Sequence, residues 1–191
     1  TLDDNGNLEL DRMAPNLGAN VPDGQRYEYD AANRLTKTWR TQGTDPTADD
    51  ELLLAVVYDA LGRRVESDAY VDTASGAALA DPSVTLHVFV GLTPIAEYDV
   101  TTDGVGGHTP TIAREFVWGA RFPEPIAMID HTDLGDQPAD EAEVLHYLND
   151  VLGSVVALTN SNGEVVERYE YDPYGTTVIE DAGGVPLALI D

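Results

Sequence analysis

The sequence predicts an all-β fold built from stacked antiparallel β-hairpins. Short segments rich in β-branched and aromatic residues alternate with turn signals along the chain, a pattern typical of a sheet made of short strands. No segment keeps a helical hydrophobic period over about ten residues. A third observation, a recurring turn unit, joins the strands into hairpins. Because one hairpin cannot bury its own face, the hairpins must stack on their neighbours.

The recurring turn unit begins with aspartate and has glycine or asparagine three residues later. The aspartate caps backbone N–H groups of the turn, and glycine or asparagine adopts a left-handed conformation at little cost. A shortened copy at residues 2–8 contains Asp3 and Gly6. The turn pairs that we assign are Asp30 with Asn33, Asp59 with Gly62, Asp150 with Gly153, and Asp172 with Gly175.

Residues 145–179 hold the densest set of hairpin signals. Two turn sequences, at 149–153 and 160–163, separate three short apolar or alternating segments. The second contains Asn-Gly, a strong hairpin signal because its positive φ matches the twist of the flanking strands. In the last segment, Tyr169 and Tyr171 must share one face of a strand because side chains alternate.

The remaining strands follow from runs of β-branched and aromatic residues between polar, glycine-rich or proline-containing loops. We expect loops at 15–24, 43–50, 73–82 and 99–110, and an acidic loop at 133–143 with one helical turn as an option. We expect strands at 26–30, 34–40, 52–58, 63–70, 84–90, 95–98, 111–118, 126–130 and 186–190.

The chain is strongly acidic, since 35 Asp and Glu residues face 10 Lys and Arg residues and give a formal net charge of −25. Such a surface repels nucleic acid and anionic membranes, whose phosphates require Lys and Arg. No apolar run reaches membrane length, so we predict no membrane insertion. The simplest interpretation of the acidic charge is that it keeps the protein soluble. The alternative is that some of the acids bind divalent cations. The absence of cysteine excludes disulfides, cysteine zinc sites and thiol catalysis.

Two motifs, Tyr-x-Tyr-Asp-x-x-Asn-Arg-Leu at 27–35 and Tyr-Asp-x-Leu-Gly-Arg-Arg at 58–64, resemble the tyrosine–aspartate (YD) repeats of the rearrangement-hotspot (RHS) family. The 145–179 stretch resembles that family's core-associated region through its Asn-Gly and Tyr-Asp-Pro-Tyr-Gly sequences. The resemblance implies an arc of a spiral shell around a cavity. It divides a single domain, 1–191, into tandem YD repeats at 27–70, middle hairpins at 84–130 and the core-associated region.

The resemblance does not extend to the protease segment that many RHS proteins contain. Many RHS proteins continue with a self-cleaving aspartyl protease segment after the last Tyr-Asp-Pro-Tyr-Gly unit, and Asp172-Pro173 belongs to that unit rather than to the protease. Because the chain begins inside a repeat, we expect it to be a piece of a larger protein. An open arc leaves two edge strands with unpaired backbone groups. We therefore expect these edges to pair with flanking YD repeats or with copies of the chain, giving oligomers or fibres.

Two kinds of binding site are candidates, each with a structural alternative. The Tyr-x-Tyr pairs can form a glycan surface, although strand tyrosines more often pack with the hydroxyl at the rim. Oxygen-rich loops can bind calcium, although turn aspartates more often cap the backbone. The candidate glycan residues are Tyr27, Tyr29, Tyr169 and Tyr171, and the candidate calcium ligands are Asp3, Asp99, Asp103 and Asp133.

Catalysis has the least support. The histidines, His87, His108, His131 and His146, lack partners at metal-ligand spacing, and Ser154 lies in a hairpin turn rather than a nucleophile elbow. We therefore expect no enzyme and no cofactor other than calcium. The favoured function is a structural, encapsulating or assembly module that is secreted or on the cell surface. The alternatives are an adhesive carbohydrate- or calcium-binding module and the cargo-enclosing shell of a toxin-delivery protein.

Overall fold

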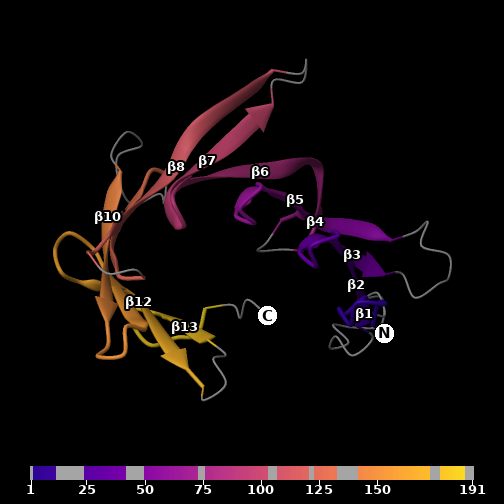
Figure 1. Cartoon of the computed structure of the whole chain (residues 1–191). Coiled ribbons are helices and arrows are strands. Elements are labelled where there is room, and N and C mark those ends of the chain that lie inside the picture. The colour runs from indigo at the N-terminus through magenta and orange to yellow at the C-terminus, as the bar shows by residue number, and fades with distance from the viewer. Residues whose placement is uncertain are drawn as a thin grey trace. The chain divides into compact units, whose positions relative to one another are not determined.

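All regular elements of the described residues are β-strands (Figure 1). The computed structural model describes residues 2–11, 24–41, 50–72, 76–102, 107–120, 123–132, 142–172 and 177–187. The strands are β1 (Leu10–Asp11), β2 (Gly24–Tyr29), β3 (Leu35–Thr41), β4 (Glu51–Tyr58), β5 (Arg64–Val71), β6 (Ala78–Val90), β7 (Thr93–Thr102), β8 (His108–Trp118), β9 (Pro125–Asp130), β10 (Glu143–Asn149), β11 (Val155–Thr159), β12 (Val165–Tyr171) and β13 (Thr177–Asp181).

The strands form one open sheet in which each strand is hydrogen-bonded to the next strand along the chain. The pairings for which the register is known are all antiparallel. The all-β prediction of stacked antiparallel hairpins is therefore confirmed. The strand order begins with β1 and ends with β13.

The chain divides into two compact units. Unit 1 contains Thr1–His87 and Asp99–Thr111, and unit 2 contains Val88–Tyr98 and Ile112–Asp191. Both units are built on the same plan, because successive hairpins contribute neighbouring strands.

Unit 1 buries few large side chains among its described residues. Val56 on β4 is its buried hydrophobic residue, at 8% exposure. On β3, the Trp39 ring instead carries two cations, with the Arg26 guanidinium 4.8 Å and the Lys37 ammonium 5.7 Å from its centroid. Arg26 also pairs with Asp50 at 2.9 Å. Long half-buried side chains thus cover the sheet where a thicker protein would place an apolar core.

Unit 2 has a thin core of small residues. Ala113, Ala127 and Ala157 are buried on β8, β9 and β11, together with Leu145 and Leu158. No described side chain in the molecule is completely buried. Alanine on a strand allows a neighbouring side chain to lie flat across it, which suits a sheet with little apolar material on either face.

Strands β6, β7 and β8 extend into segments that the sequence predicts as loops, and β8 begins at His108 rather than at residue 111. β6 begins at Ala78 and includes Pro82, and β7 continues through Asp99 to Thr102. Between Ala69 and Val71 on β5, the register with β6 shifts, so the Pro82 segment forms a bulge. A proline is tolerated there because no ladder hydrogen bond needs its missing N–H. The loop prediction for 73–82 and 99–110 was wrong over these residues.

The C-terminal segment also differs from the prediction. β13 at Thr177–Asp181 was not predicted, and it pairs with β12 through Tyr169 and Ile179. Within the predicted strand at 186–190, Pro186 forms a single bridge to Glu180, and 188–190 lie outside the described residues. The helical turn considered for 133–143 lies almost entirely outside them as well, and β10 begins at Glu143.

Candidate functional site

Six turns share one hydrogen-bond pattern. In each turn the N–H of the first residue donates to the carbonyl of the fifth, and the N–H of the fourth donates to the carbonyl of the first, at 2.9–3.1 Å. The fourth residue has a φ between 60° and 90°, so the turn is a type I turn closed by a left-handed residue. The six are Asp3–Asn7, Asp30–Arg34, Asp59–Arg63, Asp150–Ser154, Asn160–Glu164 and Asp181–Val185.

The first side chain of each turn holds the backbone in place. Its Oδ1 accepts hydrogen bonds from the N–H groups of the third and fifth residues at 2.8–3.0 Å in all six turns. The turn at Asp181 was missed by the sequence reasoning, although Gly184 stands three residues after Asp181. In the predicted turn at 172–175, Asp172 is exposed and Gly175 lies outside the described residues.

In three turns the fifth side chain donates to the second carboxylate oxygen. Arg34 Nε lies 2.7 Å from Asp30 Oδ2, and Arg63 Nε lies 2.6 Å from Asp59 Oδ2. Asn7 makes the same bond to Asp3 at 2.9 Å. In the turn that begins with Asn160 the roles are reversed, because Asn160 Nδ2 donates to the Glu164 carboxylate at 3.0 Å.

These bonds stabilise the charged form of the turn aspartates. The backbone N–H of Arg34, followed by its side chain, lowers the pKa of Asp30. For Asp3, the Asn7 side chain is the largest cause of a lowered pKa. For Asp59, desolvation acts in the opposite direction, but the side chain and backbone of Arg63 outweigh it and lower the pKa. Each of these carboxylates is therefore ionised and saturated by its own turn.

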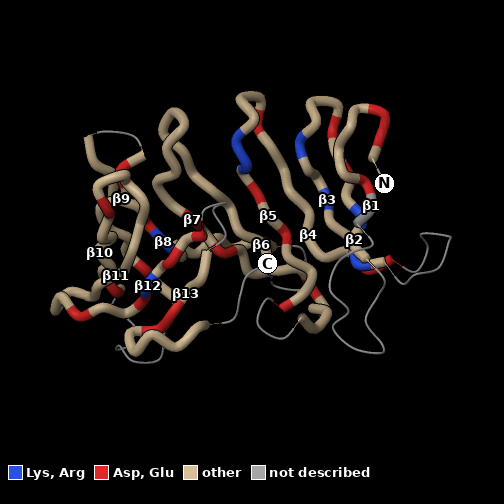
Figure 2. Tube along the Cα trace, turned by 90° about the horizontal axis from the view of Figure 1, so that it is seen from below, with Lys and Arg blue, Asp and Glu red and all other residues tan. Residues whose placement is uncertain are grey.

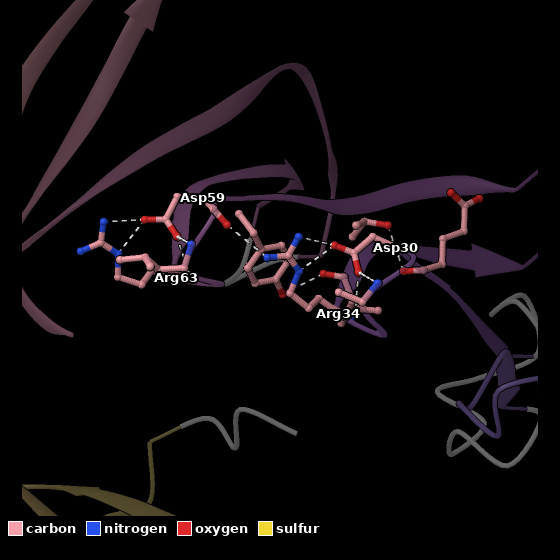
Figure 3. Close-up of polar contacts among 10 residues, drawn as sticks. Asp30, Arg34, Asp59 and Arg63 are labelled. Carbon is pink, nitrogen blue, oxygen red and sulfur yellow. Dashed lines mark hydrogen bonds and ion pairs between the residues drawn. The ribbon is translucent and has the colours of Figure 1, made fainter. Parts of the chain in front are cut away.

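Neighbouring turns of unit 1 are tied to one another. Arg34 of the second turn donates through Nη1 to the carbonyl of Asp59 in the third turn at 3.2 Å (Figure 3). Its guanidinium lies 4.8 Å from the centre of the Tyr58 ring. Asn7 of the first turn donates to Asn33 of the second at 3.1 Å. One arginine thus closes its own turn and docks the next hairpin.

A second recurring contact, which we call the latch, joins five pairs of described strands beside the turns. The last residue of β2, β4, β8, β10 or β12 donates a side-chain hydrogen bond to a backbone carbonyl near the start of the preceding strand. The donor and acceptor pairs are Tyr29 and Leu8, Tyr58 and Leu35, Trp118 and Pro94, Asn149 and Pro125, and Tyr171 and Val155, at 2.6–3.1 Å.

The latch satisfies a carbonyl that the strand ladder does not reach. Between β3 and β4 the paired residues end with Lys37 and Ala55, and Leu35 lies beyond that point. The Tyr58 hydroxyl reaches the Leu35 carbonyl at 2.8 Å, so the polar group is not left without a partner. The tyrosine of the Tyr-Asp unit thus performs a backbone role that its residue type alone did not reveal.

The candidate glycan tyrosines are engaged inside the sheet. Tyr29 and Tyr171 are latch donors, as described above. Tyr27 donates to the Gln25 side chain at 2.8 Å, and Tyr169 donates to Glu167. Burial, followed by the bond to Glu167, raises the pKa of Tyr169. Tyr171 is the most exposed of the four, at 45%, and the other three are half-buried.

The calcium candidates that the structure describes, Asp3 and Asp99, do not form a common site. Both carboxylate oxygens of Asp3 accept hydrogen bonds within its own turn. Asp99 lies on β7 and accepts a hydrogen bond from Thr85 Oγ1 at 3.3 Å. Asp103 and Asp133 lie outside the described ranges. Within those ranges, no group of three or more His, Asp or Glu side chains is arranged to hold a metal ion.

Two histidines have partners that the sequence did not suggest. His87 Nε2 lies 3.1 Å from Ser67 Oγ, and His131 Nε2 lies 2.9 Å from Glu115 Oε1. Ser67 pairs with Thr85 in the ladder of β5 and β6, so His87, two residues further along β6, is a diagonal neighbour on the same face. Only the strand register brings these residues together, and no spacing within one segment could have revealed them.

The described part of the chain contains no helix long and apolar enough to cross a membrane.

No protein-family model and no curated protein matches the chain. Its fold is similar to part of a chain in a structure of the Photorhabdus luminescens Tc holotoxin pore with a substitution in TccC3. The identity is 19%, the TM-score is 0.55, and the match covers 88% of this chain and 7% of that chain.

Two structures of TcdB2–TccC3 complexes also match over most of the chain. One lacks the hypervariable C-terminal region, with 12% identity, a TM-score of 0.26 and coverage of 94% of this chain and 11% of that chain. The other, TcdB2–TccC3-TEV, has 14% identity, a TM-score of 0.25 and coverage of 95% and 11%. The chain thus spans between 7% and 11% of the length of these three chains.

Proposed function

We propose that the chain is a wall segment of an RHS/YD-type shell in a secreted or cell-surface toxin-delivery protein, where it helps to enclose cargo and has no catalytic role. The observation that carries this proposal is the repeated unit of turn and latch, which recurs in both units of a sheet with strictly sequential pairing. Repeating this unit extends the sheet by one hairpin at a time, so a wall of any length can be built. The fold likeness to part of a Tc holotoxin structure supports the same function.

The partners of this wall are further hairpins of the same kind. Strands β1 and β13 stand at the ends of the pairing order, although the segment at 185–187 already bonds to part of β13. Backbone groups at such edges can pair with a neighbouring strand. Flanking YD repeats would extend the ladder and place the next turn beside the last. We favour this function over adhesion, because the candidate glycan tyrosines are bonded within the sheet and the described calcium candidates do not converge.

Electron microscopy of the native protein that contains this chain tests the proposal. We expect a hollow particle whose wall is one sheet thick. Cargo enclosed in that particle should resist added protease. A solid particle, or a filament built by the chain alone, would contradict the proposal. Specific binding on a glycan array would favour the adhesive function instead.

A further inference from the structure

We propose that unit 2 carries a self-association surface, through which two copies of this chain meet at the ends of their strands. The surface consists of exposed apolar residues at the β6–β7 turn and the β10–β11 turn, which lie on either side of the β8–β9 turn, and at the strand ends between them. We call it the apolar rim. Its members are Val90, Leu92, Val117, Leu148, Val151 and Leu152. This inference does not depend on the wall function.

The rim residues are unusually exposed for their type. Val151 and Leu152, in the turn between β10 and β11, are 101% and 88% exposed, and Leu92, in the turn between β6 and β7, is 69% exposed. Val117 and Leu148 end or nearly end β8 and β10, which finish at the same end of the sheet because the strands alternate in direction. Large exposed apolar residues gathered at one end of a sheet mark a candidate interaction site.

Charge is sparse at this end of unit 2, where Glu124 in the β8–β9 turn and Asp150 in the β10–β11 turn are the charged residues among the described positions of the three turns. Residues 88–96 contain no charged side chain, and in 147–158 the one charged residue is Asp150, whose Oδ1 already accepts from Leu152 N and Ser154 N. The chain as a whole carries −25. The two apolar turns are therefore much less charged than the chain as a whole.

The distribution of charge selects a second copy as the occupant. At the other end of the unit 2 strands lie acids such as Asp130, Glu143 and Asp181. Six of the eight described Lys and Arg residues lie between 26 and 64, in unit 1 (Figure 2). Copies that met through their acidic ends would bring like charges together. Rim-to-rim contact keeps those ends apart, and a surface that is apolar throughout is complementary to itself, as an isologous dimer requires.

A lipid bilayer is the less favoured occupant. Apolar segments that dock on membranes are accompanied by Lys and Arg at the headgroup level. The unit 2 bases in the described ranges are Arg114 and Arg168, and Arg114 is paired with Asp130 at 3.2 Å and Glu97 at 3.5 Å. The rim therefore offers bilayers an apolar contact without the accompanying positive charge.

Substitution of the rim with a matched control tests the proposal. V151D/L152D adds two acids at turn positions whose side chains point into solvent, so folding should be unaffected and can be verified by circular dichroism. A60D/L61D places the same charges at the equivalent positions of the turn at Asp59, outside the rim. We expect light scattering of the 191-residue chain to show a dimer that V151D/L152D weakens at least about tenfold and A60D/L61D leaves intact.

Salt distinguishes an apolar rim from a charged interface. Raising NaCl from about 0.1 M to about 1 M should strengthen the dimer, because screening removes the repulsion between acidic copies while apolar contact persists. A monomer at concentrations up to about 100 µM, a dimer that salt dissociates, or equal loss in both variants would overturn the proposal. Flotation of a monomeric chain with phosphatidylcholine vesicles, lost in V151D/L152D, would also overturn it in favour of a bilayer.

Discussion

The carboxylate of Asp59 accepts hydrogen bonds from Leu61 N, Arg63 N and Arg63 Nε, all within its own turn. Asn160 accepts the same two backbone bonds in its turn without a charge. The residue that starts the turn therefore supplies two separable effects, a backbone cap that asparagine reproduces and an ion pair that it does not. A substitution can separate them.

The turn aspartates should make the fold acid-sensitive. Folding lowers the pKa of Asp3, Asp30 and Asp59, so their stabilisation is complete above the ordinary pKa of about 4 and is lost as the pH falls through the lower folded value. We expect the Tm to fall below about pH 4. D59N should have a lower Tm at neutral pH and a shallower acid slope. Parallel slopes in a series of calorimetric scans would contradict this assignment.

Replacing the glycine at the left-handed turn position should destabilise the fold through backbone strain alone, without any steric clash of the new side chain. A Cβ on Gly153 would meet no atom within 4 Å, yet φ is +90° there. G153A should therefore destabilise the fold by about 1 kcal/mol, which is the strain of an L-residue in this region. G153N serves as the control and should cost less, because asparagine tolerates this region and occupies the equivalent position at Asn33, where φ is 60°. Urea unfolding measures both, and an equal cost for the two variants would remove the argument.

At the scale of the element, the hairpin is fixed by its turn and by the latch that ties it to the strand before. Five of the six described turns were visible in the sequence because the first residue and the positive-φ residue lie three positions apart, within one local motif, and the turn at Asp181 was overlooked. It was not sufficient for the latch, because Tyr58 and Leu35 are brought together by strand pairing. The Pro82 bulge and β13 were missed for a related reason, since pairing with β5 and β12 makes strands of segments with weak local preference.

Removing a latch should loosen one junction between strands. Y58F deletes the bond to the Leu35 carbonyl and leaves a half-buried acceptor unsatisfied, at a cost of about 1 kcal/mol. Amide exchange should accelerate where β3 and β4 meet the turns. Y27F is the matched control, because the Tyr27 hydroxyl bonds to a side chain, Gln25, and should cost less. Equal losses in the two variants would mean that the latch has no special role.

At the scale of the whole molecule, the net charge of −25 opposes folding through self-repulsion. The thin cores of alanine and half-buried side chains give limited apolar burial to offset it. Screening by salt should therefore matter more for this chain than for a protein of balanced charge. This holds whether or not any acid binds a metal ion.

Salt should raise the Tm, and calcium provides a test of the acidic loops. We expect NaCl to stabilise the chain progressively as the screening length falls from about 10 Å at 0.1 M. CaCl2 at matched ionic strength should give the same rise. An additional rise that a chelator reverses would instead show an occupied site, and substitution of Asp3, Asp99, Asp103 and Asp133 in turn would locate it.

The sequential pairing of the sheet has a consequence for synthesis. Because every strand bonds to its neighbours along the chain, the contact order is low and each hairpin can form soon after it leaves the ribosome. Co-translational growth of this kind needs no distant segment to complete a core. A polypeptide of any length could thus be built hairpin by hairpin, with each finished hairpin serving as the template for the next.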